Sequence, residues 1–254
     1  MVDYELRGKK VRVATPYETF VHPKFQSRGI FSGLLDNVML ASREAAIDML
    51  FFFPNSNSQR GLEKKNWKFI EKPVSYYLRP LISLRNLTTF ADIRKPFLAS
   101  AQLGNYEQFT IQPPDSFDTK GLIHRPSLDY LRWRFNEFRE NVYRHYKSGC
   151  VEIIARVGKR GQLREAQIVY LNLNSQHSTQ RAEADLKTIV NDMRSCFDLV
   201  GMPASPSSRY VAVLSRLGFF QVPSSTNFCY LPLRSEISVS HSDLEFTGID
   251  FHTY

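Results

Sequence analysis

The feature that most constrains this 254-residue chain is a pattern that recurs at one fixed spacing. Residues 62–67, LEKKNW, and residues 214–219, LSRLGF, share a leucine, a basic residue and a closing aromatic, and they lie 152 positions apart. The same offset carries the helical pattern of 30–47 onto that of 182–199. Matching features at one constant offset are typical of a duplicated unit. We therefore expect the chain to fold as two related units.

Composition excludes several classes of protein. With 43% hydrophobic residues the chain can bury a substantial core. No stretch reaches the roughly 18 apolar residues of a membrane span, and the opening segment lacks the apolar core of a signal peptide. We therefore expect a cytoplasmic protein with no membrane partner.

The cysteines and the charge further narrow the classes of protein to which the chain can belong. Cys150, Cys196 and Cys229 are odd in number and far apart, which predicts buried thiols and no metal site. The net charge of +8 is spread in small groups. It fits a solvated basic surface, or the attraction of a polyanion such as a nucleotide cofactor or a nucleic acid.

Strands and helices are expected to alternate in the first half. Residues 9–21 alternate like a strand, and apolar residues recur at helical spacing over 30–47. The run DMLFFFP, residues 48–54, predicts a buried strand stopped by a proline. Asn55 or Ser56 can cap a short helix, because their side-chain oxygens accept from its first N–H groups.

The second half begins after a linker-like segment, QPPDSFDTKG, which places a domain boundary near residue 112. We expect domains over 1–112 and 113–254. A helix is expected over 90–102, and another over PSLDYLRWRFNEF with Trp133 in the core. Further strands are expected at 141–147, 150–157 and 165–173, and an amphipathic helix is expected at 182–199.

The stretch VHPKFQSRGIFSGLL, residues 21–35, carries the main functional signal. A strand ends near Pro23, a short polar loop follows, and Gly29 opens an apolar helix. Such a junction leaves backbone N–H groups unpaired, and a nest of this kind favours a phosphate. The corresponding stretch of the second copy, STQRAE at 178–183, has no glycine, so only the first copy is expected to keep the nest.

These residues resemble the GNAT superfamily of acyl-CoA-dependent N-acetyltransferases. Its signature loop, (Gln/Arg)-x-x-Gly-x-(Gly/Ala) after Val-x-Pro, is matched by Val21-x-Pro23 and then Gln26-Ser27-Arg28-Gly29-Ile30-Phe31. Its second signature is matched by Asn55-x-x-Ser58-x-x-x-Leu62-x-Lys64-x-Asn66-Trp67. The wider pattern resembles a tandem GNAT-like branch found in bacteria or archaea near polysaccharide genes.

The resemblance implies two GNAT-like α+β (α/β) units, with mixed, mostly antiparallel sheets flanked by helices. It implies acetyl-CoA as the acyl donor, held through its pyrophosphate by the loop amides and through its pantetheine by neighbouring main chain. The implied cofactor-binding residues are Phe20, Val21, Gln26, Ser27, Arg28, Gly29, Ile30, Phe31, Asn55 and Ser58.

The implied reaction is direct attack of a primary amine, carried by a small acceptor such as an amino sugar, on the thioester. Glu18 is the candidate general base, and a surface carboxylate with no catalytic role is the alternative. Two residues depart from the family pattern. Phe31 replaces a small residue at the end of the loop, and Leu62 stands where many relatives place a tyrosine that protonates the leaving thiolate.

The chain begins at what would be the family's fourth strand, so the first unit is expected to be N-terminally truncated. An uncovered sheet edge there would favour a homo-oligomer. Two alternatives remain open. One is a tandem-GNAT transferase that takes an aminoacyl group from charged tRNA, the only reading with a nucleic-acid partner. The other is a catalytically silent binding or scaffold protein.

Overall fold

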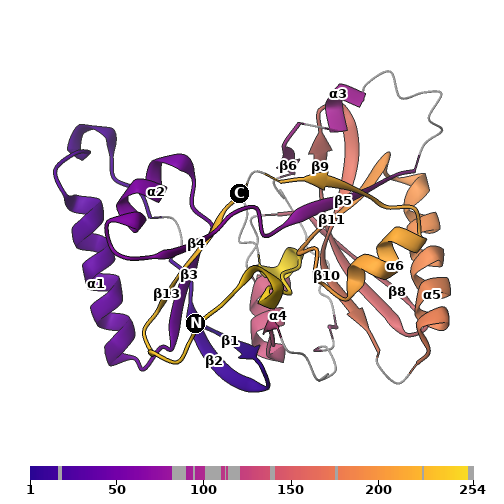
Figure 1. Ribbon diagram of the computed structural model, residues 1–254. Coiled ribbons are helices and arrows are strands. Elements are labelled where there is room, and N and C mark those ends of the chain that lie inside the picture. The colour runs from indigo at the N-terminus through magenta and orange to yellow at the C-terminus, as the bar shows by residue number, and fades with distance from the viewer. Residues whose placement is uncertain are drawn as a thin grey trace. The chain divides into compact units, whose positions relative to one another are not determined.

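The computed structural model describes residues 1–16, 19–81, 90–93, 95–100, 110–111, 113, 121–137, 141–174, 177–224 and 226–250 (Figure 1). The chain forms two compact units, each discontinuous in sequence. Unit 1 comprises Met1–Pro73, Thr119–His124 and Ser225–Leu244, and unit 2 comprises Val74–Asp118, Arg125–Ser224 and Glu245–Tyr254. The boundary expected near residue 112 stays a prediction, and both compact units take residues from either side of it.

Unit 1 is built on one mixed sheet with the strand order β4-β13-β3-β2-β1-β7. Among the described strands of this sheet, β2 and β3 run parallel and the other neighbours are antiparallel. The strands are β1 (Val2–Leu6), β2 (Lys9–Ala14), β3 (Met49–Phe52), β4 (Lys68–Ile70), β7 (Leu122–His124) and β13 (Phe228–Pro232). The helices are the 3-10 turns η1 (Pro23–Phe25) and η5 (His241–Asp243), with α1 (Ile30–Glu44) and α2 (Ser56–Glu63).

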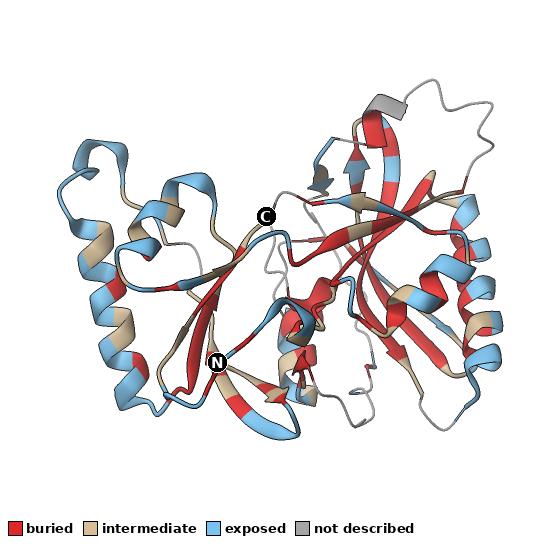
Figure 2. Ribbon diagram, viewed as in Figure 1, coloured by how far each residue is buried: buried red, intermediate tan, exposed pale blue. Residues whose placement is uncertain are grey.

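Helices α1 and α2 cover one face of this sheet. The cluster beneath them comprises Leu35, Ile47, Leu50, Leu62, Trp67 and Cys229. Figure 2 shows that α1 is exposed or half-buried along most of its length, whereas β3 is largely buried. Ile30 and Leu34, expected on the covered face, are 42% and 39% exposed. The helix is where its periodicity predicts, but its apolar face is only partly covered.

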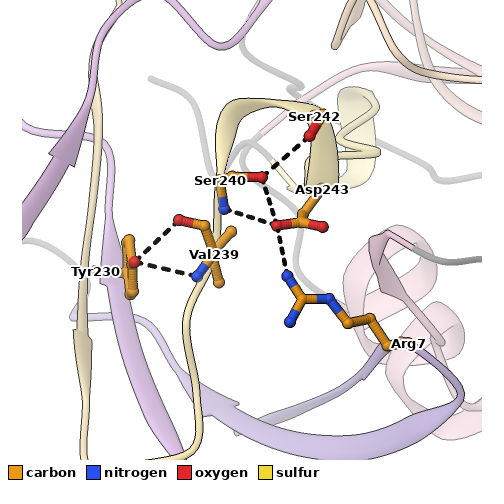
Figure 3. A network of polar contacts seen from close by, with 6 residues as sticks. All are labelled: Arg7, Tyr230, Val239, Ser240, Ser242 and Asp243. Carbon is orange, nitrogen blue, oxygen red and sulfur yellow. Dashed lines mark hydrogen bonds and ion pairs between the residues drawn. The ribbon is translucent and has the colours of Figure 1, made fainter.

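The segment after β13 is fastened to unit 1 by polar contacts (Figure 3). The Tyr230 hydroxyl donates to the Val239 carbonyl at 2.9 Å and accepts from the Val239 N–H at 3.1 Å, in a buried position. Asp243 Oδ2 accepts from the backbone N–H and the hydroxyl of Ser240 at 2.7 and 2.6 Å, and it pairs with Arg7 at 3.0 Å. A buried tyrosine and a capping carboxylate therefore hold the segment in place.

Unit 2 is built on a second sheet with the order β12-β5-β11-β10-β9-β6, and β8 also pairs with β9. Here β10 and β11 are the parallel pair. The strands are β5 (Ser75–Pro80), β6 (Phe97–Ala99), β8 (Tyr143–Ser148), β9 (Val151–Arg160), β10 (Leu163–Leu173), β11 (Leu199–Ala204) and β12 (Phe220–Pro223). The helices are α3 (Phe90–Ile93), α4 (Leu128–Arg132), a π-helical turn (Trp133–Glu137), α5 (Thr179–Asp192), α6 (Tyr210–Arg216) and the 3-10 turns η4 (Met193–Ser195) and η6 (Gly248–Asp250).

The same order of elements occurs twice along the chain. The series β2-α1-β3-α2-β4-β5 is followed by β10-α5-β11-α6-β12-β13. This agrees with two α+β units of one kind, as the offset of 152 positions predicts. The last strand of each series pairs in the other sheet: β5 lies between β11 and β12, and β13 lies between β3 and β4.

Several local expectations are wrong for identifiable reasons. The helix expected over 90–102 is described as helical only to Ile93, and β6 follows Pro96, because proline cannot continue a helix. Trp133, expected in the core, is 41% exposed, whereas Leu131 and Phe135 are buried. The helical periodicity was sound, but the π-helical turn changes which residues face inward.

The expectations for the cysteines and for the N-terminal sheet edge also differ from the structure. Cys229 is buried as expected, but Cys150 and Cys196 are only half-buried. β1 is not an edge strand: it pairs with β7 over Tyr4–Leu6, so the sheet edge expected to be open near the N-terminus is covered there.

The contacts of Asp243 predict a pH-dependent stability. Burial raises the pKa of this carboxyl, but hydrogen bonds from Ser240 and the charge of Arg7 outweigh burial, so its pKa lies below the ordinary value. A lowered pKa stabilises the fold above about pH 4, and this contribution is lost as the pH falls through the folded-state pKa. We expect Asp243→Asn to lower the free energy of unfolding at pH 7 by about 1 kcal/mol, with the difference from wild type shrinking towards pH 3.

Urea unfolding of the full chain at pH 7, 5 and 3 measures this difference. Asp3→Asn is the matched control, because Asp3 pairs with Lys10 on an exposed surface and such pairs contribute little. An effect of Asp243→Asn that is the same at every pH would contradict the prediction.

Candidate cofactor site

The site begins where two parallel strands separate in unit 1. β2 and β3 pair only at Val13 with Met49 and at Ala14 with Leu50. Beyond these pairs β3 continues beside β13, while the chain after Ala14 leaves the sheet. The Thr15 hydroxyl oxygen is buried at this point and has no hydrogen-bond partner among the described residues. Sequence reasoning missed Thr15, because a threonine at a strand end is ordinary.

The loop that follows is a tight turn fixed by its own side chains. The Gln26 amide donates to the Val21 carbonyl at 3.0 Å, and His22 Nδ1 accepts from the Lys24 N–H at 3.3 Å. Ser27 and Gly29 then take positive φ angles of 61° and 77°. This left-handed backbone is where glycine is favoured, so Gly29 is the residue that lets α1 begin in this direction.

The turn leaves a run of N–H groups without partners. In the described part of the chain, the backbone N–H groups of Ser27 through Ser32 have no hydrogen-bond acceptor. The Gly33 N–H, which donates to the Gly29 carbonyl at 3.0 Å, is the first of the helix to be bonded. Unpaired amides at the positive end of a helix dipole attract an anion. This is the geometry that a phosphate nest needs.

Phe31 does not cover these amides. A Cβ built on Gly61 of α2 would lie 2.7 Å from Phe31 Cε1, so the ring packs directly on Gly61. The ring also joins the cluster that contains Leu35 and Leu62. Phe31 therefore faces the core of unit 1, and the departure from a small residue at the end of the loop is accommodated by a glycine 30 positions later.

Asn55 and Ser58 lie together at the start of α2. Asn55 Oδ1 accepts from the N–H groups of Asn57 and Ser58 at 3.0 and 2.9 Å, and the Ser58 hydroxyl donates to the Asn55 carbonyl at 3.1 Å. The expected capping of this helix is confirmed. The side-chain NH₂ of Asn55 has no partner among the described residues, so it can donate to a ligand.

Other expected site residues differ in their surroundings. Phe20 is 79% exposed and lies outside any strand, because the strand expected over 9–21 ends at Ala14. Leu62 is 1% exposed in the core and cannot supply a proton to a leaving group. Glu18, the candidate base, lies outside the described residues.

In unit 2 the corresponding region is occupied by the segment that contains Phe246 and Gly248, called the filling segment below. β10 and β11 pair in parallel at Glu165–Gln167 with Leu199–Gly201, and β10 then has a bulge between Ile168 and Tyr170. At this bulge a Cβ on Gly248 would lie 2.6 Å from the Ile168 carbonyl oxygen.

Hydrogen bonds fix this filling segment and close the adjacent helix start. The Ser205 N–H donates to the Phe246 carbonyl at 2.9 Å, and the Phe246 N–H donates to the Ser205 hydroxyl at 3.0 Å. The Ser178 hydroxyl caps α5 by accepting from the Arg181 N–H at 3.3 Å. Unit 2 thus has a side-chain cap where unit 1 has Gly29 and free amides.

None of the helices in the described residues combines the length and apolarity needed to cross a bilayer. Within the same ranges, no three His, Cys, Asp or Glu side chains gather as a metal site would require.

These features define an α+β fold of the GCN5-related N-acetyltransferase type. A GCN5-related N-acetyltransferase from Anabaena variabilis has a TM-score of 0.56 and 14% identity, covering 90% of this chain and 57% of that chain. A probable N-acyltransferase from Enterococcus faecalis has a TM-score of 0.57 and 10% identity, covering 90% and 56%. Saccharomyces cerevisiae N-myristoyltransferase with bound myristoyl-CoA has a TM-score of 0.50 and 12% identity, covering 96% and 67%.

At these identities the likeness shows the fold. The chain spans little more than half the length of the Anabaena and Enterococcus structures. No protein-family model matches the sequence. A comparison with curated proteins likewise finds no match.

The close approach at Gly248 predicts that the filling segment stabilises unit 2. In Gly248→Ala the new Cβ would meet the β10 backbone, which cannot rotate away as a side chain could. We expect the free energy of unfolding to fall by about 1–3 kcal/mol. Gly33→Ala is the control, because Gly33 lies in α1 with open space around it, and alanine there should stabilise by about 0.5–1 kcal/mol. Urea unfolding of both full-length variants measures the difference, and equal effects would contradict the expectation.

Proposed function

We propose that this protein transfers an acyl group from acyl-CoA to a primary amine of a small acceptor, with acetyl-CoA as the donor. The observation that carries the proposal is the run of unpaired N–H groups from Ser27 to Ser32, next to the point where β2 and β3 separate. The fold supports it, since similar structures include N-acetyltransferases and an N-myristoyltransferase with bound myristoyl-CoA.

In this proposal the unit 1 residues bind the donor in three places. The unpaired amides from Ser27 to Ser32 hold the diphosphate, and the Phe31 ring does not cover them because it packs on Gly61. The main chain of Phe20 and Val21 holds the pantetheine as a neighbouring strand would. The free NH₂ of Asn55 donates to the pantetheine, while the Asn55 side-chain oxygen stays engaged in the α2 cap.

The reaction requires that the amine be positioned against the thioester and that the amine lose a proton. The amine nitrogen attacks the thioester carbon directly, and CoA departs as a thiolate as the C–S bond breaks. Glu18 accepts the proton that the amine loses. With Leu62 buried in the core, no acid stands at that position, and a thiolate needs less help to leave than an alkoxide does. An amino sugar is the acceptor that we propose first.

Calorimetric titration of the full chain with acetyl-CoA tests the binding step, and assays with a panel of small amines, amino sugars included, test the transfer. We expect binding of acetyl-CoA and transfer to at least one amine. Salt-dependent binding of tRNA without binding of CoA would overturn the proposal in favour of an aminoacyl-tRNA-dependent transferase. Binding of neither ligand would favour a scaffold role.

A pair of glycine variants isolates the nest. Gly29 and Gly8 have φ angles of 77° and 75°, and neither has a heavy atom within 4 Å of an added Cβ. Alanine at either position should therefore destabilise the fold by a similar amount, about 1–2 kcal/mol. Only Gly29→Ala should reorient the amides, weakening acetyl-CoA binding about tenfold or more. Calorimetric titration measures the Kd of both variants for acetyl-CoA. Equal binding by the two variants would refute the role of the nest.

The role of Glu18 has a separate kinetic test. Removal of a general base typically lowers the rate 10²–10⁴-fold. We expect Glu18→Gln to lower kcat about a hundredfold or more while leaving the Kd for acetyl-CoA unchanged. Glu44→Gln, at the exposed end of α1, is the control and should leave both constants as in wild type. Retention of kcat in Glu18→Gln would remove Glu18 from the mechanism.

A further inference from the structure

An aromatic ring stands exposed beside the nest. Phe25 lies in η1, two residues before Ser27, and is 50% exposed. The guanidinium carbon of Arg28 lies 5.6 Å from the centre of the Phe25 ring. The centre of the His22 ring lies 5.9 Å from the same Phe25 ring centre. Phe25 belongs to none of the core clusters among the described residues. Two neighbours hold the ring at the surface, and folding alone does not require an aromatic residue there.

Two positive charges near this ring have no ion-pair partner within the described ranges. Lys24 and Arg28 flank Phe25 in sequence, and neither forms an ion pair with a described residue. A cation over an aromatic face, without an ion-pair partner in the described part of the chain, suits a ligand that combines a flat base with phosphates. A purely apolar partner would leave these charges desolvated and unpaired.

We propose that Phe25 stacks against the adenine ring of the acyl-CoA donor, with Lys24 and Arg28 next to the phosphate on its ribose. The inference rests on the proposed function, because it takes the diphosphate to lie at the amides from Ser27 to Ser32. In CoA only a ribose separates the adenine from the diphosphate. A ring two residues before the nest is therefore within reach of the base.

The stack has a consequence that differs between fragments of the donor. Base stacking on an aromatic side chain typically contributes on the order of tenfold in affinity or more. Ligands with the adenosine gain this contribution, whereas 4′-phosphopantetheine, which lacks the adenosine, does not. Loss of the Phe25 ring should thus weaken one ligand and spare the other.

Calorimetric titration of the full chain with CoA and with 4′-phosphopantetheine tests this difference. We expect Phe25→Ala to raise the Kd for CoA about tenfold and to leave that for 4′-phosphopantetheine within about twofold. Phe25→Trp should keep CoA binding near the wild-type value. Leu40→Ala is the matched control, because Leu40 is an apolar residue of α1 that is 59% exposed and lies well beyond the nest. It should change neither Kd.

Each contrary result has a definite meaning. An unchanged Kd for CoA in Phe25→Ala, or an equal loss for both ligands, overturns the stack while the proposed function stands. The equal loss would mean that the ring only supports the loop. Failure of wild type to bind CoA overturns the proposed function, and the stack with it.

Discussion

The short parallel pairing of β2 with β3 is the constraint on which the candidate site depends. It lasts only for Val13–Ala14 against Met49–Leu50. After Ala14 the chain leaves the sheet, and it passes through η1 and the turn at Gly29 before α1 begins. The free amides of that turn follow from this path, because the first N–H groups of any helix lack partners within it.

A single buried carboxylate fixes where this pairing begins. Asp48, just before β3, accepts from the Arg12 N–H at 2.8 Å through its side chain, and its own N–H donates to the Arg12 carbonyl at 2.9 Å. Arg234 pairs with the same carboxylate at 2.7 Å, and the Leu233 N–H donates to the Asp48 carbonyl. One residue thus connects β2, β3 and the end of β13, which holds the register of the sheet at the base of the opening.

The sequence predicted what local rules govern. The Asn55 cap and the start of α1 after Gly29 each depend on residues close together in the sequence, so pattern and propensity suffice. The direction of the Phe31 ring depends on Gly61, and the filling of unit 2 depends on Gly248, far away along the chain. No local rule contains such pairings, because they arise only when distant segments pack.

The exchange of final strands between the two sheets has a consequence for how the chain acquires its fold. Phe52 in β3 meets Cys229 in β13, a partner 177 residues later. During synthesis β3 and β4 therefore have unpaired edges until β13 has been made. Such distant pairings are slow to form, and the waiting edges are open to pairing with other chains. The nascent chain is thus exposed to aggregation until β13, an interior strand of this sheet, has been made.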